Sequence, residues 1–208
     1  MSPRHLHPGL NHPRSPEAEQ AEVGSSVFGF WIFLMSDALV FALLFAVYGT
    51  QVHATGSGPH PAQVVNLPSA LLQTGLLLAS SYTFGLASLA LKFKAERPGL
   101  ASAWLCVTLL LGLAFLGAEV HDLVDLYQRG AAPQRSGFLS ALHTLVCMHG
   151  LHVATGCLWL LVMLVQIRVM GLASEVTSRL MRLALFWHFL DIIWVGIFTV
   201  VYLQGARL

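Results

Sequence analysis

The chain has 208 residues, of which 56% are hydrophobic and only 10% are charged, and its mean hydropathy is +0.69. Soluble domains carry about a quarter charged residues, so this composition excludes an ordinary soluble globule as well as a disordered or collagen-like chain. Eleven Lys and Arg nearly balance ten Asp and Glu, so no net charge favours nucleic acid or an acidic partner.

The first segment of the chain, residues 1–26, is polar and rich in Pro, His and Glu. This composition predicts a flexible tail. The tail has no basic segment joined to a short apolar core, so we do not expect it to be a cleavable signal peptide.

Five apolar runs follow, each long enough for a helix across a bilayer core of about 30 Å. They cover residues 27–50, 67–91, 100–118 or slightly more, 136–167 and 183–206. Their length and their lack of two-residue alternation favour helices over strands. The sequence therefore predicts an all-α membrane domain over residues 27–208, a bundle of five transmembrane helices.

Lys and Arg are unequally divided between the two sides of this bundle. One side holds Arg4, Arg14, Lys92, Lys94, Arg97, Arg168, Arg179 and Arg182, and the other holds Arg129, Arg135 and Arg207. Cytoplasmic loops carry the excess of positive charge. We therefore expect a cytoplasmic N-terminus and a periplasmic C-terminus.

Two apolar runs contain an acidic residue near the middle, where insertion of a charge costs about 2.5–3.5 kcal/mol. Asp37 in the first run is interpreted either as a proton-relay group or as a hydrogen-bonded tie between helices. His188 and Asp191 in the fifth run are three residues apart and share one face of a helix. We interpret them as a structural pair.

The fourth run contains His149 and His152, three residues apart, and His143, nine residues before His152. A regular helix points His143 about 180° away from His152, so one metal cannot bind all three. A haem held by His149 and His188 is an alternative that no spacing selects. We expect hydrogen-bonded packing histidines, and no catalytic, cofactor-binding or metal-binding residue in this chain.

Glu119, Asp122 and Asp125 follow one another at three-residue steps where the third run ends. We interpret them as a solvated helix end, with cation attraction or contact with a partner subunit as the alternative. Small residues four apart, such as Ser81 and Gly85, let helices approach closely. No nucleotide-binding, nucleophile-elbow or zinc-protease motif is found.

Three segments resemble subunit III of the haem–copper respiratory oxidases. They are FGFWIFLMSD, which ends at Asp37; RSGFLSA from Arg135, which runs on to HGLHV at His149; and FWHFLDIIW, which contains His188. The resemblance extends in order over residues 28–203. Within the family it is closest to the cytochrome bo-type ubiquinol oxidase branch, which has five spans. Many members carry Glu where this chain has Asp37.

The resemblance implies an accessory subunit without redox centres, in a complex that oxidises ubiquinol, reduces oxygen to water and translocates protons. Haems and copper would lie in the catalytic subunit I. Subunits II and IV and membrane phospholipids would be further partners, in a bacterial inner membrane. The implied role is assembly, stability and proton supply. The implied buried polar cluster is Asp37, Glu119, His149, His152, His188 and Asp191.

Two other functions are compatible with the same residues. One is the subunit III-like partner of a nitric oxide reductase, which shares the five spans. The other is a stand-alone membrane carrier of protons or small molecules, which Asp37 and the histidines would serve.

Overall fold

The computed structural model describes residues 16–56, 58–93, 98–171 and 174–207. Within these ranges the chain forms long helices and no strand. The helices are α1 (Pro16–Gln51), α2 (Pro61–Val64), α3 (Leu67–Phe93), α4 (Pro98–Gln128), α5 (Gly137–Met170) and α6 (Ser174–Ile197). A 3₁₀ turn, η1 (Pro133–Arg135), precedes α5, and a π-helical turn, η2 (Phe198–Leu203), continues α6.

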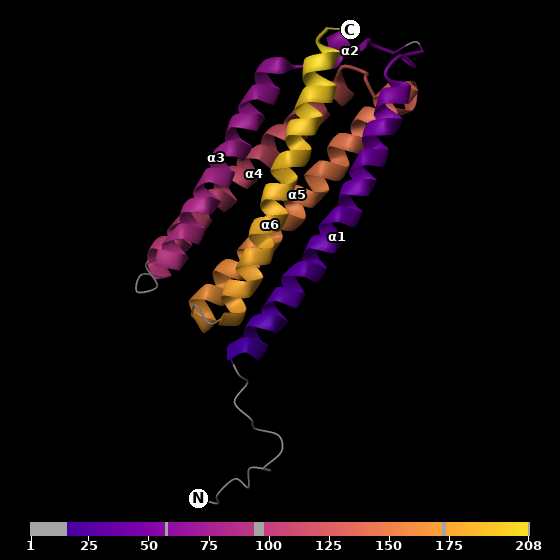
Figure 1. Ribbon diagram of the computed structural model, residues 1–208. Coiled ribbons are helices and arrows are strands. Elements are labelled where there is room, and N and C mark those ends of the chain that lie inside the picture. The colour runs from indigo at the N-terminus through magenta and orange to yellow at the C-terminus, as the bar shows by residue number, and fades with distance from the viewer. Residues whose placement is uncertain (1–15, 57, 94–97, 172–173, 208) are drawn as a thin grey trace, which may run out of the picture.

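Five of these helices are long and apolar enough to cross a membrane, namely Val27–Gln51, Leu67–Ala90, Gly99–Gln128, Gly137–Met170 and Glu175–Leu203. They run side by side along one axis (Figure 1). α3 packs most extensively on α4, and α5 contacts α1, α4 and α6. α6 also contacts α1 and α3. The prediction of an all-α bundle with five spans is confirmed.

The helix boundaries differ clearly from the sequence prediction at three places, one of which is the start of α6 at Ser174 rather than at residue 183. α1 begins at Pro16, so residues 16–26 are helical, whereas they were assigned to the tail; residues 1–15 of that tail lie outside the described part. Pro is favoured in a first helical turn, and the Ala, Glu and Gln that follow are good helix formers. α4 continues to Gln128, because apolar residues such as Leu123 continue the helical pattern past Glu119.

Local signals explain where α5 begins and ends. The Ser136 hydroxyl accepts a hydrogen bond from the backbone N–H of Leu139 at 3.1 Å, which caps the first turn. At the other end Gly171 takes φ +68° and donates its N–H to the Ile167 carbonyl. This conformation suits glycine, which has no Cβ.

The centre of the bundle is aromatic, and the indole N–H groups of two buried tryptophans are hydrogen-bonded to a neighbouring helix. Trp187 and Trp194 of α6 are 1% exposed. Their indole N–H groups donate to the hydroxyl oxygens of Ser80 at 3.1 Å and Thr74 at 3.0 Å, both on α3. A Cβ on Gly112 would lie 2.9 Å from the Trp187 ring, so the indole of Trp187 packs against the α4 backbone only because this residue is glycine.

Candidate functional site

Polar side chains gather in two parts of the bundle: a layer near the middle of the spans, and a cavity at the end of the bundle where α4 ends and α3 begins. The first part contains Asp37, His149, His152, His188 and Asp191. The second contains Glu119, Asp122 and Asp125. The structure thus divides the six predicted cluster residues between two sites.

Asp37 of α1 and His152 of α5 face each other near the middle of the membrane spans. The Asp37 Oδ2 lies 3.2 Å from the His152 Nε2, and the two side chains are 14% and 20% exposed. The His152 Nδ1 donates to the Met148 carbonyl at 2.7 Å. A carbonyl oxygen can only accept, so Nδ1 carries a proton and Nε2 is the nitrogen that faces the carboxyl group.

His149 of α5 is fully buried among aromatic rings. Its ring centroid lies 5.3 Å from that of Trp194 and 5.8 Å from that of Phe115, which it meets edge to face. Neither of its ring nitrogens has a hydrogen-bond partner among the described residues. His149 therefore packs as an aromatic side chain, and among the described residues it lacks the hydrogen bonds that were expected of a packing histidine.

His188 and Asp191 lie next to each other on α6, at the boundary with α3. The His188 Nδ1 is 3.5 Å from the Asp191 Oδ2 and 2.9 Å from the Ser81 hydroxyl. The His188 side chain is 49% exposed, whereas that of Asp191 is 12% exposed. The predicted pair is present, but the imidazole lies at the surface of the bundle rather than inside it.

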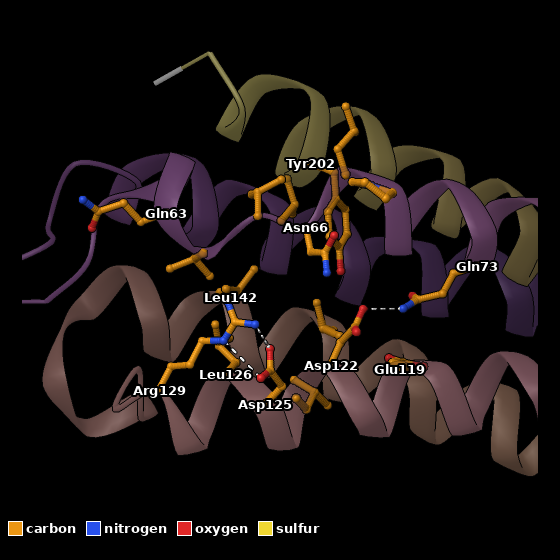
Figure 2. Close-up of a pocket in the computed structure, with 17 residues that line it drawn as sticks. Gln63, Asn66, Gln73, Glu119, Asp122, Asp125, Leu126, Arg129, Leu142 and Tyr202 are labelled. Carbon is orange, nitrogen blue, oxygen red and sulfur yellow. Dashed lines mark hydrogen bonds and ion pairs between the residues drawn. The ribbon is translucent and has the colours of Figure 1, made fainter.

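The cavity at the end of the bundle has a volume of about 470 Å³. It lies between α3, α4 and the η2 turn, which contributes Tyr202 (Figure 2). The Asp122 Oδ2 accepts hydrogen bonds from Ser69 at 2.6 Å and Gln73 at 2.7 Å. Asp125 forms an ion pair with Arg129 at 2.7 Å.

Glu119 also lines this cavity but is buried, with 3% exposure. A Cβ on Gly150 of α5 would meet both carboxylate oxygens of Glu119 at 2.9 Å, so the missing side chain makes room for them. Neither oxygen has a hydrogen-bond partner among the described residues. The prediction of a solvated helix end is therefore wrong for Glu119, because α5 covers this turn of α4; the more exposed Asp125 does lie at the surface.

Sequence reasoning did not identify Ser69, Gln73 and Tyr202 as part of a site. Ser69 and Gln73 are four residues apart on α3, and this spacing was a usable signal because it puts both on one helix face. Tyr202 had no such signal, since a π-helical turn changes the register of its side chain. In the described part of the chain, no group of three or more His, Cys, Asp or Glu side chains is arranged to hold a metal ion.

The family model and the similar proteins found by comparison agree on one family. The family model described as cytochrome c oxidase subunit III matches residues 19–206. The cytochrome bo(3) ubiquinol oxidase subunit 3 of Pseudomonas aeruginosa is 51% identical over 88% of this chain and 87% of its own length. The quinol oxidase subunit 3 of Bacillus subtilis is 35% identical over 96% and 97%. With most of its length matched in each comparison, the chain belongs to the cytochrome c oxidase subunit III family.

Proposed function

We propose that this chain is the accessory subunit III of a proton-translocating ubiquinol oxidase in a bacterial inner membrane. It would be non-catalytic and pack against a separate catalytic subunit that carries the haems and copper, with subunits II and IV and phospholipids as further neighbours. Its N-terminus would be cytoplasmic and its C-terminus periplasmic. The names of the relatives support the complex, and the five spans support the location.

The main support for the accessory role is that the side chain of His188 is exposed. This residue lies about midway along the span Glu175–Leu203, and half of its side chain is exposed. Its Nδ1 edge contacts Ser81 and Asp191, so the Nε2 edge is left for a neighbour outside the chain. Lipid tails offer no hydrogen bond, and ionisable groups at this depth face protein or water.

The surface beside His188 allows a helix to approach closely. Ser81 and Gly85 are four residues apart on α3, and a Cβ on Gly85 would meet no atom within 4 Å. Small residues at this spacing favour contact between transmembrane helices. Large apolar side chains are exposed on the outer face of α1, such as Leu39, and also on α3 and α6, such as Tyr82 and Ile192, so the polar edge of His188 is the feature that distinguishes the α3/α6 face. We assign the α3/α6 face to the catalytic subunit.

The Asp37–His152 pair supports the second part of the role, proton supply. It joins α1 to α5 through a 3.2 Å contact between a carboxyl group and an imidazole, two kinds of group that transfer protons. The same contact ties the two helices, so it also serves stability.

Replacement of Asp37 by Asn keeps the shape and the hydrogen bond but removes titration. We expect an assembled complex with slower sustained turnover; normal turnover would restrict the pair to a structural role.

The docking assignment is tested by His188→Leu in the tagged chain, with Val40→Leu as a control at an exposed position of α1, outside the face assigned to the catalytic subunit. Haem from the catalytic subunit that copurifies in mild detergent measures attachment. We expect His188→Leu to lower the haem recovered per tagged chain and Val40→Leu to leave it unchanged. Full recovery with His188→Leu would show that this face contacts lipid.

A further inference from the structure

The cavity at the end of the bundle contains hydrogen-bond acceptors that lack donors. Both carboxylate oxygens of Glu119 and the Oε1 of Gln73 are buried, line the cavity and have no partner among the described residues. The Gln73 Nε2 is already used, since it donates to Asp122. Buried acceptors without donors cost free energy, so a ligand for this cavity must donate hydrogen bonds.

The charges around the cavity are also unbalanced. Asp125 is neutralised by Arg129, which is the only Lys or Arg among the described lining residues. Glu119 and Asp122 remain without a Lys or Arg partner there. His121 lies 3.7 Å from Asp122, but its side chain is 82% exposed and is not part of the lining. The ligand should therefore be positively charged.

The size and the walls of the cavity indicate an organic cation rather than a bare metal ion. Its volume of about 470 Å³ lies in the range of small-molecule pockets. Apolar side chains form much of the wall, among them Leu123, Leu126, Leu142, Val146 and Val201. No set of three metal-ligating side chains is present in the described part of the chain. The π-helical turn η2 places Tyr202 against the cavity, and such turns frequently occur at functional sites.

We propose that this cavity binds a primary ammonium group attached to an apolar body. An ammonium has three N–H donors, which match the free oxygens of Glu119 and Gln73, while Asp122 supplies a second negative charge. The apolar body would lie along the leucine and valine wall. The group could belong to a free amine or to the headgroup of an aminophospholipid, because the cavity lies where the spans of α3 and α4 reach the membrane surface.

The wild-type complex provides the first test and needs no variant. The intact oxidase in phosphatidylcholine nanodiscs is titrated with butylammonium and, separately, with butyltrimethylammonium, and binding is measured by saturation-transfer NMR. The two probes have the same charge and chain, but only the first has N–H donors. We expect butylammonium to bind at least about tenfold more tightly, since hydrogen bonds to charged groups contribute about 1.5–3 kcal/mol and 1.4 kcal/mol is tenfold. Equal binding, or no binding of either probe, would overturn the proposal.

Variants assign the site to these carboxylates. Glu119→Gln and Asp122→Asn keep the side-chain shape, and each replaces a carboxyl group by an amide. Both should weaken butylammonium binding about tenfold, by the same hydrogen-bond magnitude. Glu175→Gln is the matched control, because Glu175 is a 73% exposed carboxylate at the start of α6. Unchanged binding in both cavity variants would contradict the assignment. If one variant does not assemble, binding to the other variant tests the assignment alone.

A third arm distinguishes the two sources of the ammonium. The titration is repeated in nanodiscs that contain phosphatidylethanolamine of the same acyl chains. A weaker apparent affinity for butylammonium identifies the lipid headgroup as a competing occupant, and an unchanged affinity identifies a free amine. Both results retain the ammonium site. The proposal of an ammonium site is contradicted if the wild-type complex binds no ammonium, for instance because a lysine of another subunit fills the cavity.

Discussion

The middle of the bundle and its C-terminal end both contain buried acids, but only in the middle does an imidazole lie beside each acid. Asp37 faces His152 at 3.2 Å, and Asp191 faces His188 at 3.5 Å. At the end of the bundle, Glu119 has no partner among the described residues, and Asp122 interacts with a hydroxyl and an amide rather than with a Lys or Arg. An imidazole of the same chain stabilises each acid in the middle, whereas the Glu119 carboxyl group in the cavity would be stabilised by a ligand from outside the chain.

The largest effect should come from breaking the mid-span pair. His152→Leu leaves the Asp37 carboxyl without its partner in a largely buried position, and removal of one member of a buried pair costs about 3 kcal/mol. We expect a loss of this size in the free energy of unfolding of the detergent-solubilised complex. The double variant Asp37→Leu with His152→Leu should recover part of it; additive losses would show that the two side chains are not coupled.

Gly150→Ala should have the next largest effect, because it acts on the cavity from α5. The added Cβ would lie 2.9 Å from both Glu119 oxygens, and overpacking of a filled interior costs about 2 kcal/mol. Thermal unfolding of the complex measures the loss. Gly117→Ala on α4 is the control, since its Cβ would meet nothing within 4 Å. Equal stability of the two variants would mean that Glu119 moves away freely.

A smaller effect is expected from Ser69→Ala, which removes one donor from Asp122. The bond is short, at 2.6 Å, but Gln73 continues to donate to the same oxygen. We expect a loss of about 1 kcal/mol in the free energy of unfolding, measured by the same thermal unfolding. A loss as large as that of His152→Leu would remove the distinction between the two sites.

The smallest effect should come from Arg129→Gln at the rim of the cavity. The Arg129 and Asp125 side chains are 67% and 41% exposed, and exposed ion pairs contribute within about 0.5 kcal/mol. The unfolding midpoint should hardly change. Butylammonium binding should become slightly tighter, since Asp125 is then no longer neutralised. Weaker binding would show that Arg129 does not oppose a cation in this cavity.

The architecture was predictable because run length and composition alone identify a membrane span. The His188–Asp191 pair was also predictable, since helical geometry brings residues three apart to one face. The contacts of Asp37 with His152 and of Ser69 with Asp122 depend on how separate helices align, which spacing within one helix does not encode. Spacing and polarity alone did not predict the start of α1 or the burial of Glu119, because polar residues beside an apolar run indicate solvent unless the neighbouring helix is known. Only the family resemblance implied that Glu119 is buried.

The central claim is that this chain acts beside a separate electron-carrying subunit and has no redox group of its own. The most direct test is the visible spectrum of the tagged chain, purified in mild detergent and then again after harsher detergent has removed its neighbours. We expect a Soret band in the first sample and none in the second. A Soret band that remains with the single chain, or ubiquinol turnover by that chain alone, would contradict it.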